Sequence, residues 1–253
     1  MLRALFFDMD GVIVDTERDG HRVAFNQTFQ HFGIPDRWDE DLYHDLLQIA
    51  GGKERMKHYF TTMAETPPVP RADIDRLVAE MHTYKTSRLI DILEKAQLPL
   101  RPGVQRFMRE ANQAGLAMAI CTTSNERAAH AVAATMLADI EFAAILAGDV
   151  VSRKKPDPEI YLLALHKTGC SAAECLVVED SRNGVVAAKA AGIPVIATTN
   201  HYTEREDLSQ SDLIVSCLGD SNGERAVVRK PRGGFAVDGI VHLEEVKRYL
   251  YDR

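Results

Sequence analysis

The chain is poor in long apolar runs, in cysteine and in basic charge. No apolar stretch among its 253 residues approaches the length needed to cross a bilayer. Only four cysteines occur, and their spacing matches no zinc motif. They are Cys121, Cys170, Cys175 and Cys217. We therefore expect buried, reduced thiols in a cytoplasmic protein rather than disulfides.

Charge and length set further limits on the class of protein. The formal net charge of −7 argues against nucleic acid or an anionic membrane as the main partner. It does not exclude a phosphorylated substrate, because local lysines and a bound cation set the field at a site. A strand expected from Leu2 or Arg3 leaves no room for a signal peptide. A length of 253 residues, 45% of them apolar, predicts one large or two modest domains with a sizeable core.

The most informative segment is an apolar run that ends in two carboxylates. Leu5-Phe6-Phe7 precedes Asp8, Asp10 and Gly11, which indicates a buried strand followed by a turn. Alternate residues of an extended chain point the same way, so Asp8 and Asp10 should leave the strand end on one side. Two crowded carboxylates are costly unless a cation or a shared proton relieves them. The pattern suits Mg²⁺, although a simple polar turn after a strand would look the same.

Two further apolar runs end in polar residues of complementary chemistry. Thr122, Thr123 and Ser124 follow the run 116–121, Glu179 and Asp180 follow the run 175–178, and Lys155 lies between the two. Continuous apolar runs separated by helical stretches predict an α/β fold, with a doubly wound parallel sheet and helices on both faces. In such sheets, ligands bind outside the carboxyl ends of the strands. The polar residues should therefore converge on one Mg²⁺ and phosphate site.

These residues resemble the four motifs of the haloacid dehalogenase superfamily of phosphohydrolases. The motifs occur in order as Asp8-Met9-Asp10-Gly11, Thr122, Lys155-Pro156 and Glu179-Asp180-Ser181-Arg182-Asn183-Gly184. Other stretches resemble the CbbY-type branch of sugar-phosphate phosphatases, among them Asp15-Thr16-Glu17, His21-Arg22 and Gly51-Gly52-Lys53-Glu54-Arg55. The resemblance covers essentially the whole chain. It implies a Rossmann-like core, Mg²⁺ as cofactor and phosphatase activity.

The periodicity of apolar residues divides the chain into a core and an insertion. Residues from about 15 to 98 lack strand-like runs, and helices are expected over 17–32, 39–47, 53–63 and 72–95. We predict an α/β core of residues 1–16 and 99–253 and an all-α domain of residues 17–98. That insertion resembles the helical C1 cap of the family. In the tail, a last core strand is expected at 211–215, a short strand at 235–237 and a helix at 241–251.

The resemblance assigns a catalytic role to four core residues. Asp8 is the expected nucleophile that forms an aspartyl-phosphate, and Asp10 is the expected general acid and base. Lys155 is expected to offset the charge of Asp8 and of the phosphoryl oxygens. Thr122 is expected to donate its hydroxyl to a phosphoryl oxygen, or else to N-cap the next helix.

The same resemblance supplies the metal ligands. They are expected to be Asp8, the main-chain carbonyl of Asp10, and Asp180. Glu179 is either a direct ligand or, as we favour, a residue that supports the ligands. The start of the next helix, whose amide groups aid anion binding, adds candidate substrate contacts. These are Thr123, Ser124 and Asn125.

Substrate choice is expected to come from the helical insertion. Gly51-Gly52-Lys53 precedes a helical run and can offer bare amides and an ammonium group to a phosphate or to sugar hydroxyls. Lys85 and Arg88 can share a helix face, and Lys85 also matches the CbbY-type pattern. Glu17 either accepts hydrogen bonds from sugar hydroxyls or is a favourable acid in a first helical turn.

The function favoured by the sequence is a Mg²⁺-dependent phosphatase for a small sugar phosphate or sugar bisphosphate. The CbbY-type resemblance implies xylulose-1,5-bisphosphate or a similar ketose bisphosphate. A β-phosphoglucomutase-like phosphotransferase and a phosphoglycolate phosphatase stay open as alternatives. A non-catalytic sugar-phosphate sensor is less favoured, because Asp8, Asp10, Lys155 and Asp180 are all present. We expect a monomer or a weak homodimer.

Overall fold

The computed structural model describes residues 1–47, 49, 51–95, 98–230, 235 and 237–251. The polypeptide divides into two compact units, one of Met1–Asp15 with Pro99–Arg253 and one of Thr16–Leu98. We call them the core unit and the helical unit. Thr16, predicted to belong to the core, lies in the helical unit.

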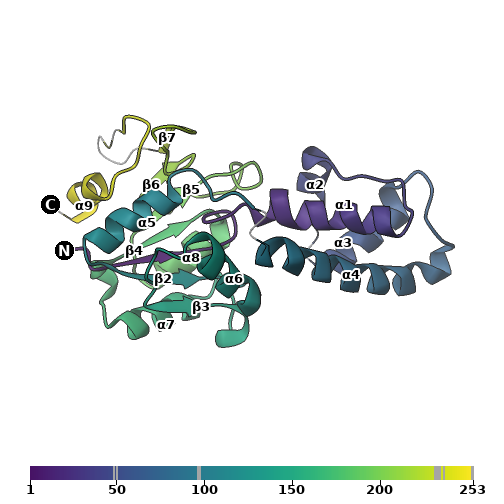
Figure 1. The fold of residues 1–253 in the computed structure, drawn as a ribbon, viewed down its shortest axis with the longest axis horizontal. Helices are drawn as coiled ribbons and strands as arrows, with labels where there is room; N and C mark the ends of the chain where they lie inside the picture. The colour runs from purple at the N-terminus through teal and green to yellow at the C-terminus, as the bar shows by residue number, and fades with distance from the viewer. Residues whose placement is uncertain (48, 50, 96–97, 231–234, 236, 252–253) are drawn as a thin grey trace. The chain divides into compact units, whose positions relative to one another are not determined.

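Within the described residues, a seven-stranded sheet in the order β3-β2-β1-β4-β5-β6-β7 forms the centre of the core unit (Figure 1). Neighbouring strands pair in parallel, except that β7 runs antiparallel to β6. The strands are β1 Ala4–Phe7, β2 Ala117–Cys121, β3 Ala144–Leu146, β4 Cys175–Glu179, β5 Val195–Thr198, β6 Leu213–Val215 and β7 Val228–Lys230. The predicted α/β fold with a doubly wound, mostly parallel sheet is confirmed.

The pairing register brings the predicted motif residues to one edge of the sheet. Strand β1 lies between β2 and β4, and Phe7 pairs with Ile120 on one side and Val178 on the other. Because the three strands are parallel, they all end at the same edge. The residues that follow them therefore leave the sheet side by side.

Helices cover both faces of the sheet. On one face, Phe6 belongs to an apolar cluster with residues of α7 (Glu159–Thr168) and α8 (Arg182–Ala190). On the other face, Phe7 packs edge-on against Phe107 of α5 (Val104–Gln113), with ring centroids 6.4 Å apart. Alternate residues of a strand thus supply two separate apolar layers, as a sheet buried on both sides requires. The core unit also contains the α-helices α6 Glu126–Met136 and α9 Leu243–Tyr251 and the short 3₁₀ helices η4 Gly148–Val150 and η5 Ala172–Glu174.

The tail differs in part from the prediction. Strand β6 falls within the predicted range 211–215, and α9 falls within 241–251. The predicted strand at 235–237 is not found, since Phe235 and Val237 lie in no strand and residue 236 lies outside the described residues. Strand β7 was missed. Its three residues, Val228–Lys230, carry two cations and no apolar run, so nothing in the local sequence distinguishes it from a loop.

The helical unit is built around aromatic side chains. Trp38, the single tryptophan of the chain, is fully buried. Its ring centroid lies 4.7 Å from that of Phe25, 4.9 Å from Phe29 and 5.3 Å from Tyr59. The elements are η1 Thr16–His21, α1 Arg22–His31, α2 Glu40–Leu46, α3 Gly52–His58, η2 Tyr59–Met63, η3 Arg71–Asp73 and α4 Ile74–Glu94. Among the helices that the structure describes, none combines the length and the apolar character that a membrane span requires.

A half-buried arginine joins three loops at the carboxyl edge of the sheet. The Arg101 guanidinium donates to the carbonyl oxygen of Gly11, in the loop after β1. It also donates to Thr198 Oγ1 at 3.1 Å and to the carbonyl oxygens of Thr199 at 2.6 Å and Ser216 at 3.1 Å. The planar guanidinium has five N–H donors, so one side chain can satisfy several backbone acceptors that would otherwise be buried without a partner.

Replacing Arg101 should therefore destabilise the core unit. Arg101→Met keeps most of the side-chain length but leaves the carbonyls of Gly11, Thr199 and Ser216 without this donor. We expect a loss of roughly 3–5 kcal/mol in the free energy of unfolding, measured by chemical denaturation. Arg109→Met is the matched control, because Arg109 lies on α5 with a half-exposed side chain paired to Asp139. Such surface pairs contribute about 0–1 kcal/mol. Equal losses in the two variants would contradict the role given to Arg101.

Candidate active site

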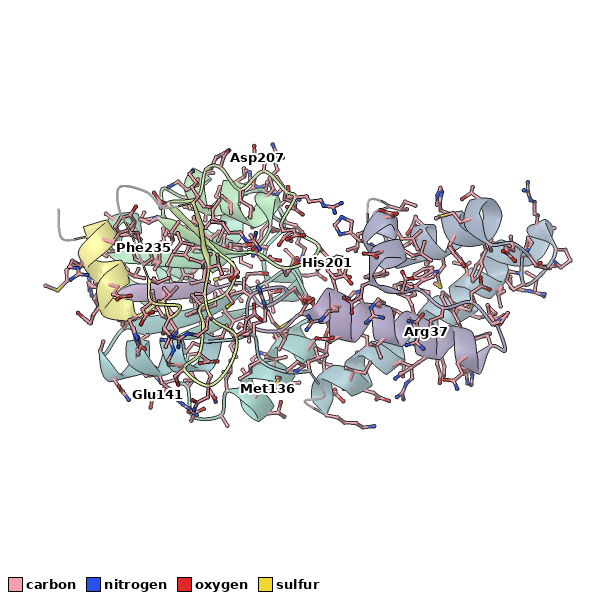
Figure 2. All side chains as sticks on the ribbon, turned by 90° about the horizontal axis from the view of Figure 1, so that it is seen from above. Arg37, Met136, Glu141, His201, Asp207 and Phe235 are labelled. Carbon is pink, nitrogen blue, oxygen red and sulfur yellow. The ribbon has the colours of Figure 1, made fainter. Side chains whose placement is uncertain are left out.

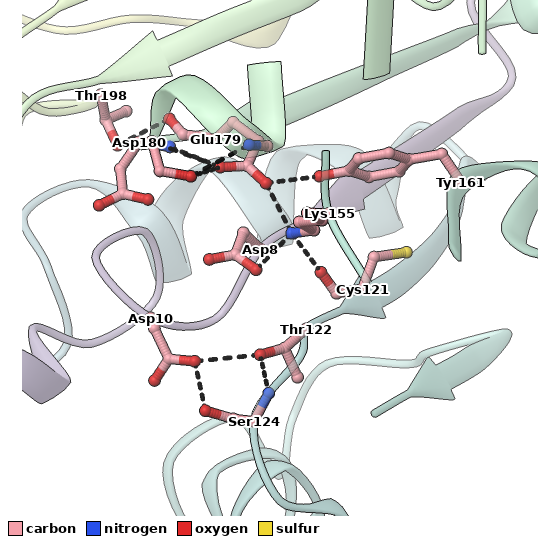
Figure 3. Close-up of polar contacts among 12 residues, drawn as sticks. Asp8, Asp10, Cys121, Thr122, Ser124, Lys155, Tyr161, Glu179, Asp180 and Thr198 are labelled. Atoms are coloured by element: carbon pink, nitrogen blue, oxygen red, sulfur yellow. Dashed lines mark hydrogen bonds and ion pairs between the residues drawn. The ribbon is translucent and has the colours of Figure 1, made fainter. Parts of the chain in front are cut away.

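Three carboxylates gather where β1 and β4 end (Figure 3). Asp8 follows β1, Glu179 is the last residue of β4, and Asp180 comes next. Oxygen atoms of all three lie within 4.8 Å of one another. The residues are only 7%, 0% and 5% exposed, respectively. Burying several carboxylates together is costly unless positive charge or hydrogen-bond donors compensate for them.

Lys155 supplies part of that compensation. Its Nζ lies 2.7 Å from Asp8 Oδ1 and 2.6 Å from Glu179 Oε1, and it donates to the carbonyl oxygen of Cys121 at 2.9 Å. Burial alone would lower the pKa of Lys155, but the two carboxylates raise that pKa above its usual value. Lys155 is therefore an ammonium group that bridges the ends of β1 and β4.

One ammonium group does not balance the cluster. Burial raises the pKa of Asp8 to about 8, and Glu179 adds to that effect while Lys155 opposes it. Burial and the charge of Glu179 hold the pKa of Asp180 well above its usual range. Both shifts indicate that the positive charge near these carboxylates does not offset their burial and mutual repulsion. The donors are all oxygens, and a hard cation such as Mg²⁺ fits a site of this composition.

Glu179 is the most heavily hydrogen-bonded member of the cluster. Its Oε1 accepts from Lys155 and, at 2.7 Å, from the hydroxyl of Tyr161. Its Oε2 accepts from the backbone amides of Asp180 at 3.0 Å and Ser181 at 3.3 Å. Both oxygens are thus occupied by protein donors. This geometry favours a role for Glu179 in positioning Lys155 and the Asp180 backbone over a role as a direct ligand.

Asp10 lies apart from the acidic cluster and is held by hydroxyl groups. Its Oδ2 accepts from Thr122 Oγ1 at 3.0 Å and from the hydroxyl of Ser124. Thr122 Oγ1 in turn accepts from the backbone amide of Ser124 at 3.0 Å. The hydroxyls of Thr122 and Ser124, expected to contact substrate, are here directed to Asp10. They fix the orientation of the carboxyl group that was assigned to acid and base catalysis.

The helix after β2 is capped by a residue other than Thr122. Asn125 is the N-cap of α6, and its side chain accepts from the backbone amide of Arg127 at 2.9 Å. The alternative that Thr122 N-caps this helix is wrong, because three residues separate Thr122 from Glu126, where the helix begins. Thr123, which was predicted to contact substrate, is exposed in the segment between β2 and α6.

The helical unit contains a polar network around Glu17, whose side chain is half-buried. Its Oε2 accepts from the Tyr43 hydroxyl at 2.6 Å, and that hydroxyl accepts from Arg55 Nη1 at 3.0 Å. Burial raises the pKa of Glu17, but His21, Tyr43 and Arg55 together bring that pKa below its usual value. Tyr43 and Arg55 were not predicted as site residues. Arg55 lies in a stretch with CbbY-type resemblance, whereas no local signal distinguishes Tyr43.

Lys85 belongs to the same network, whereas Lys53 does not. Lys85 is 4% exposed, its Nζ lies 3.1 Å from His21 Nδ1, and it stands 4.7 Å from the ring centroid of Phe25. Burial lowers the pKa of Lys85 to about 8, although Glu17 partly opposes this. The predicted pair Gly51 and Gly52 does begin α3, with Gly51 as N-cap. Lys53 follows Gly52, and its exposed side chain makes no hydrogen bond to the other residues that the structure describes.

A match to a known family identifies the class of protein to which the chain belongs. A family profile for haloacid dehalogenase-like hydrolases matches residues 2–192. The chain belongs to this family. The resemblance inferred from the four motifs is thereby confirmed.

Individual relatives agree with the CbbY-type branch. A "CBBY-like protein" of Arabidopsis thaliana is 46% identical over 226 residues, which cover 88% of this chain and 71% of the relative. CbbY from Rhodobacter sphaeroides, solved in complex with phosphate, superposes with a TM-score of 0.67 at 35% identity, covering 86% of this chain and 95% of that one. A mutant of that protein was solved with xylulose-(1,5)bisphosphate, and its chain is 34% identical to this one with a TM-score of 0.67 and the same coverage of each chain.

A relative with a named activity is consistent with phosphatase chemistry. A phosphoglycolate phosphatase of Agrobacterium fabrum is 31% identical over 202 residues, which cover 78% of this chain and 81% of the relative. The chain is a phosphatase of the haloacid dehalogenase-like hydrolase family.

Adjacent lysines provide a test of the charge bridge. Lys155→Met removes the ammonium group shared by Asp8 and Glu179, and we expect kcat for phosphate release to fall by roughly 10²-fold or more. Lys154→Met is the matched control, because Lys154 is partly exposed and contacts the Gly148 carbonyl and Asp149. Steady-state kinetics on both variants, with circular dichroism to confirm folding, make the comparison. A similar loss in both would show that Lys155 has no special place in the site.

Proposed function

We propose that this phosphatase is Mg²⁺-dependent and removes phosphate from a small sugar phosphate or sugar bisphosphate, with xylulose-1,5-bisphosphate as the first candidate. The observation that carries the chemistry is the buried set of Asp8, Lys155, Glu179 and Asp180 at the strand ends. The substrate class is supported by the CbbY relatives, one of which binds xylulose-(1,5)bisphosphate.

In this proposal, Asp8 is the nucleophile. An Asp8 oxygen forms a bond to phosphorus as the ester bond to the sugar oxygen breaks, which gives an aspartyl-phosphate. Lys155 holds Asp8 Oδ1 at 2.7 Å and offsets the charge that accumulates on the phosphoryl group. Water then attacks phosphorus and releases phosphate and Asp8. Two easier steps replace one slow hydrolysis.

Asp10 moves the protons in both steps. Its carboxyl group donates a proton to the departing sugar oxygen and later takes one from the attacking water. Thr122 and Ser124 hold the carboxyl in place through Oδ2. A group that acts first as acid and then as base must keep one orientation through both steps, and two hydroxyl donors on one oxygen provide that.

The cation would be held by Asp8, Asp180 and the main-chain carbonyl of Asp10, with Glu179 supporting the set. When bound, Mg²⁺ supplies positive charge that neutralises phosphoryl oxygens and so admits a phosphate dianion to an acidic site.

The helical unit is proposed to select the substrate. Lys85 is a buried ammonium group that can pair with a phosphate remote from the scissile one, and Glu17 can accept from sugar hydroxyls. Their network with His21, Tyr43 and Arg55 restricts each side chain to a narrow set of orientations. The amides at Gly51 and Gly52 remain additional candidates.

A phosphate-release assay tests the proposed activity. With Mg²⁺, wild-type protein should release phosphate from sugar bisphosphates, excess chelator should abolish release, and added Mg²⁺ should restore it. Asp8→Asn keeps the shape of the side chain and should lower kcat by at least ~10³-fold. Normal turnover by Asp8→Asn would contradict the aspartyl-phosphate mechanism. Interconversion of glucose phosphates without release of phosphate would instead identify a mutase.

Replacing Lys85 should impair hydrolysis of a sugar bisphosphate more than hydrolysis of a small artificial ester. Lys85→Ala should lower kcat/KM for a sugar bisphosphate by about 10- to 150-fold, the value of one charge-assisted hydrogen bond. Hydrolysis of a small artificial phosphate ester should hardly change, since that ester lacks the remote group. Arg88→Ala is the matched control on the same helix, because Arg88 contacts Gln27 and Asp91 rather than the network around Glu17.

The pH dependence gives a second readout for the same residue. Because the pKa of Lys85 is about 8, its ammonium group is lost as pH rises through that value. KM of the wild type for the sugar bisphosphate should therefore rise above pH 8, whereas Lys85→Ala should lack this rise. If Lys85→Ala lowered kcat/KM equally for the sugar bisphosphate and for the small artificial ester, Lys85 would support the fold and would not determine specificity.

A further inference from the structure

The loop after β5 supplies a hydrogen-bond donor to the candidate metal ligand Asp180. Asn200 Nδ2 donates to Asp180 Oδ2 at 2.8 Å. Among the residues that the structure describes, Asn200 is the one that donates a hydrogen bond to this carboxylate. The loop lies in the core unit, and the neighbouring His201 is exposed on it (Figure 2). No feature of the linear sequence had marked Asn200 as a site residue.

The orientation of the Asn200 amide is set by its own loop. Asn200 Oδ1 accepts from the backbone amides of Tyr202 at 2.9 Å and Thr203 at 3.0 Å. Backbone amides only donate, so the carbonyl end of the side chain must face them. The NH₂ end is then directed at Asp180. A third contact, from the Asn200 backbone amide to Thr203 Oγ1 at 3.2 Å, closes the loop.

Gly11 completes the enclosure of the same carboxylate oxygen. A Cβ atom at Gly11 would lie 1.9 Å from Asp180 Oδ2 and 2.8 Å from Asn200 Nδ2. Gly11 also has φ of +79°, which disfavours any side chain there. The backbone after β1 therefore lies directly against the Asp180 and Asn200 pair. One oxygen of Asp180 is committed to this contact, which leaves Oδ1 for a cation.

We propose that Asn200 is a positioning residue that fixes the carboxylate plane of Asp180 for metal binding. The inference rests on the proposed function, because it takes Asp180 to be a Mg²⁺ ligand. A carboxylate attached by a single bond rotates, and a hydrogen bond from a fixed donor to one oxygen selects one rotamer. Loss of such a supporting contact typically weakens metal binding by about 10- to 100-fold.

Two substitutions separate positioning from loop stability. Asn200→Ser retains an oxygen that can accept from the same backbone amides, as serine does in short turns, but it is too short to reach Asp180. Asn200→Ala removes both contacts. Thr203→Val is the matched control, because it loosens the same loop at Thr203 Oγ1 and leaves the Asp180 contact intact.

The decisive measurement is metal binding without substrate. Mg²⁺ would be titrated by calorimetry, and Mn²⁺ by electron paramagnetic resonance, into the wild type and the three variants, with Tm measured alongside. Asn200→Ser and Asn200→Ala should bind each metal about 10- to 100-fold more weakly, and Thr203→Val should bind as the wild type does. At saturating Mg²⁺, kcat of Asn200→Ser should return close to the wild-type value.

The outcomes separate this inference from the proposed function. If the wild type binds Mg²⁺ and Asn200→Ser binds it equally well, the positioning role is refuted while the metal site stands. A lower Tm in Asn200→Ser with unchanged metal affinity also refutes the positioning role, since it shows a purely structural one. If the wild type binds neither metal, both the metal site and the role of Asn200 are overturned.

Discussion

The arrangement of the core depends on one buried ammonium group, that of Lys155. It stands between Asp8 on β1 and Glu179 on β4, at 2.7 and 2.6 Å, and it also contacts the last carbonyl of β2. Three neighbouring strands thus end around a single positive charge. Without it, Asp8 and Glu179 would repel each other in a region that excludes water. The remaining excess of negative charge suits the cation and the accompanying phosphate of the proposed function.

That bridge is possible only because the sheet is parallel and in register. Phe7 pairs with Ile120 and with Val178, so the three chains reach the edge of the sheet together. Arg101 extends the same edge toward β5 and β6 by satisfying backbone carbonyls of the loops beyond them. Lys155 organises the acidic half of the edge and Arg101 the half formed by backbone acceptors. The Lys155 side chain is buried and that of Arg101 is half-buried, and both replace solvation that those oxygens lose on folding.

The sequence predicted the parts of the site that follow an apolar run. Asp8, Thr122 and Asp180 each come directly after such a run or one residue later, and a parallel sheet brings these positions together. The residues that were missed have no such local mark. Tyr43 meets Glu17 across 26 positions, and Asn200 meets Asp180 across 20. Their roles depend on loops and helix packing that a linear pattern does not encode. Strand β7 was not predicted, because an antiparallel edge strand needs no apolar run.

The four carboxylates of the candidate site differ in the number of hydrogen bonds that they accept from the protein, and this difference matches the roles proposed for them. Glu179 accepts hydrogen bonds on both oxygens from donors of the chain, so it is the least available to a ligand. Asp10 is held by two hydroxyls on one oxygen, which suits the acid and base role proposed for it. Asp8 and Asp180 each accept from one described side chain, Lys155 and Asn200, through one oxygen only. The two carboxylates with the fewest protein donors are therefore those to which we assign the bond to phosphorus and the main share of the cation.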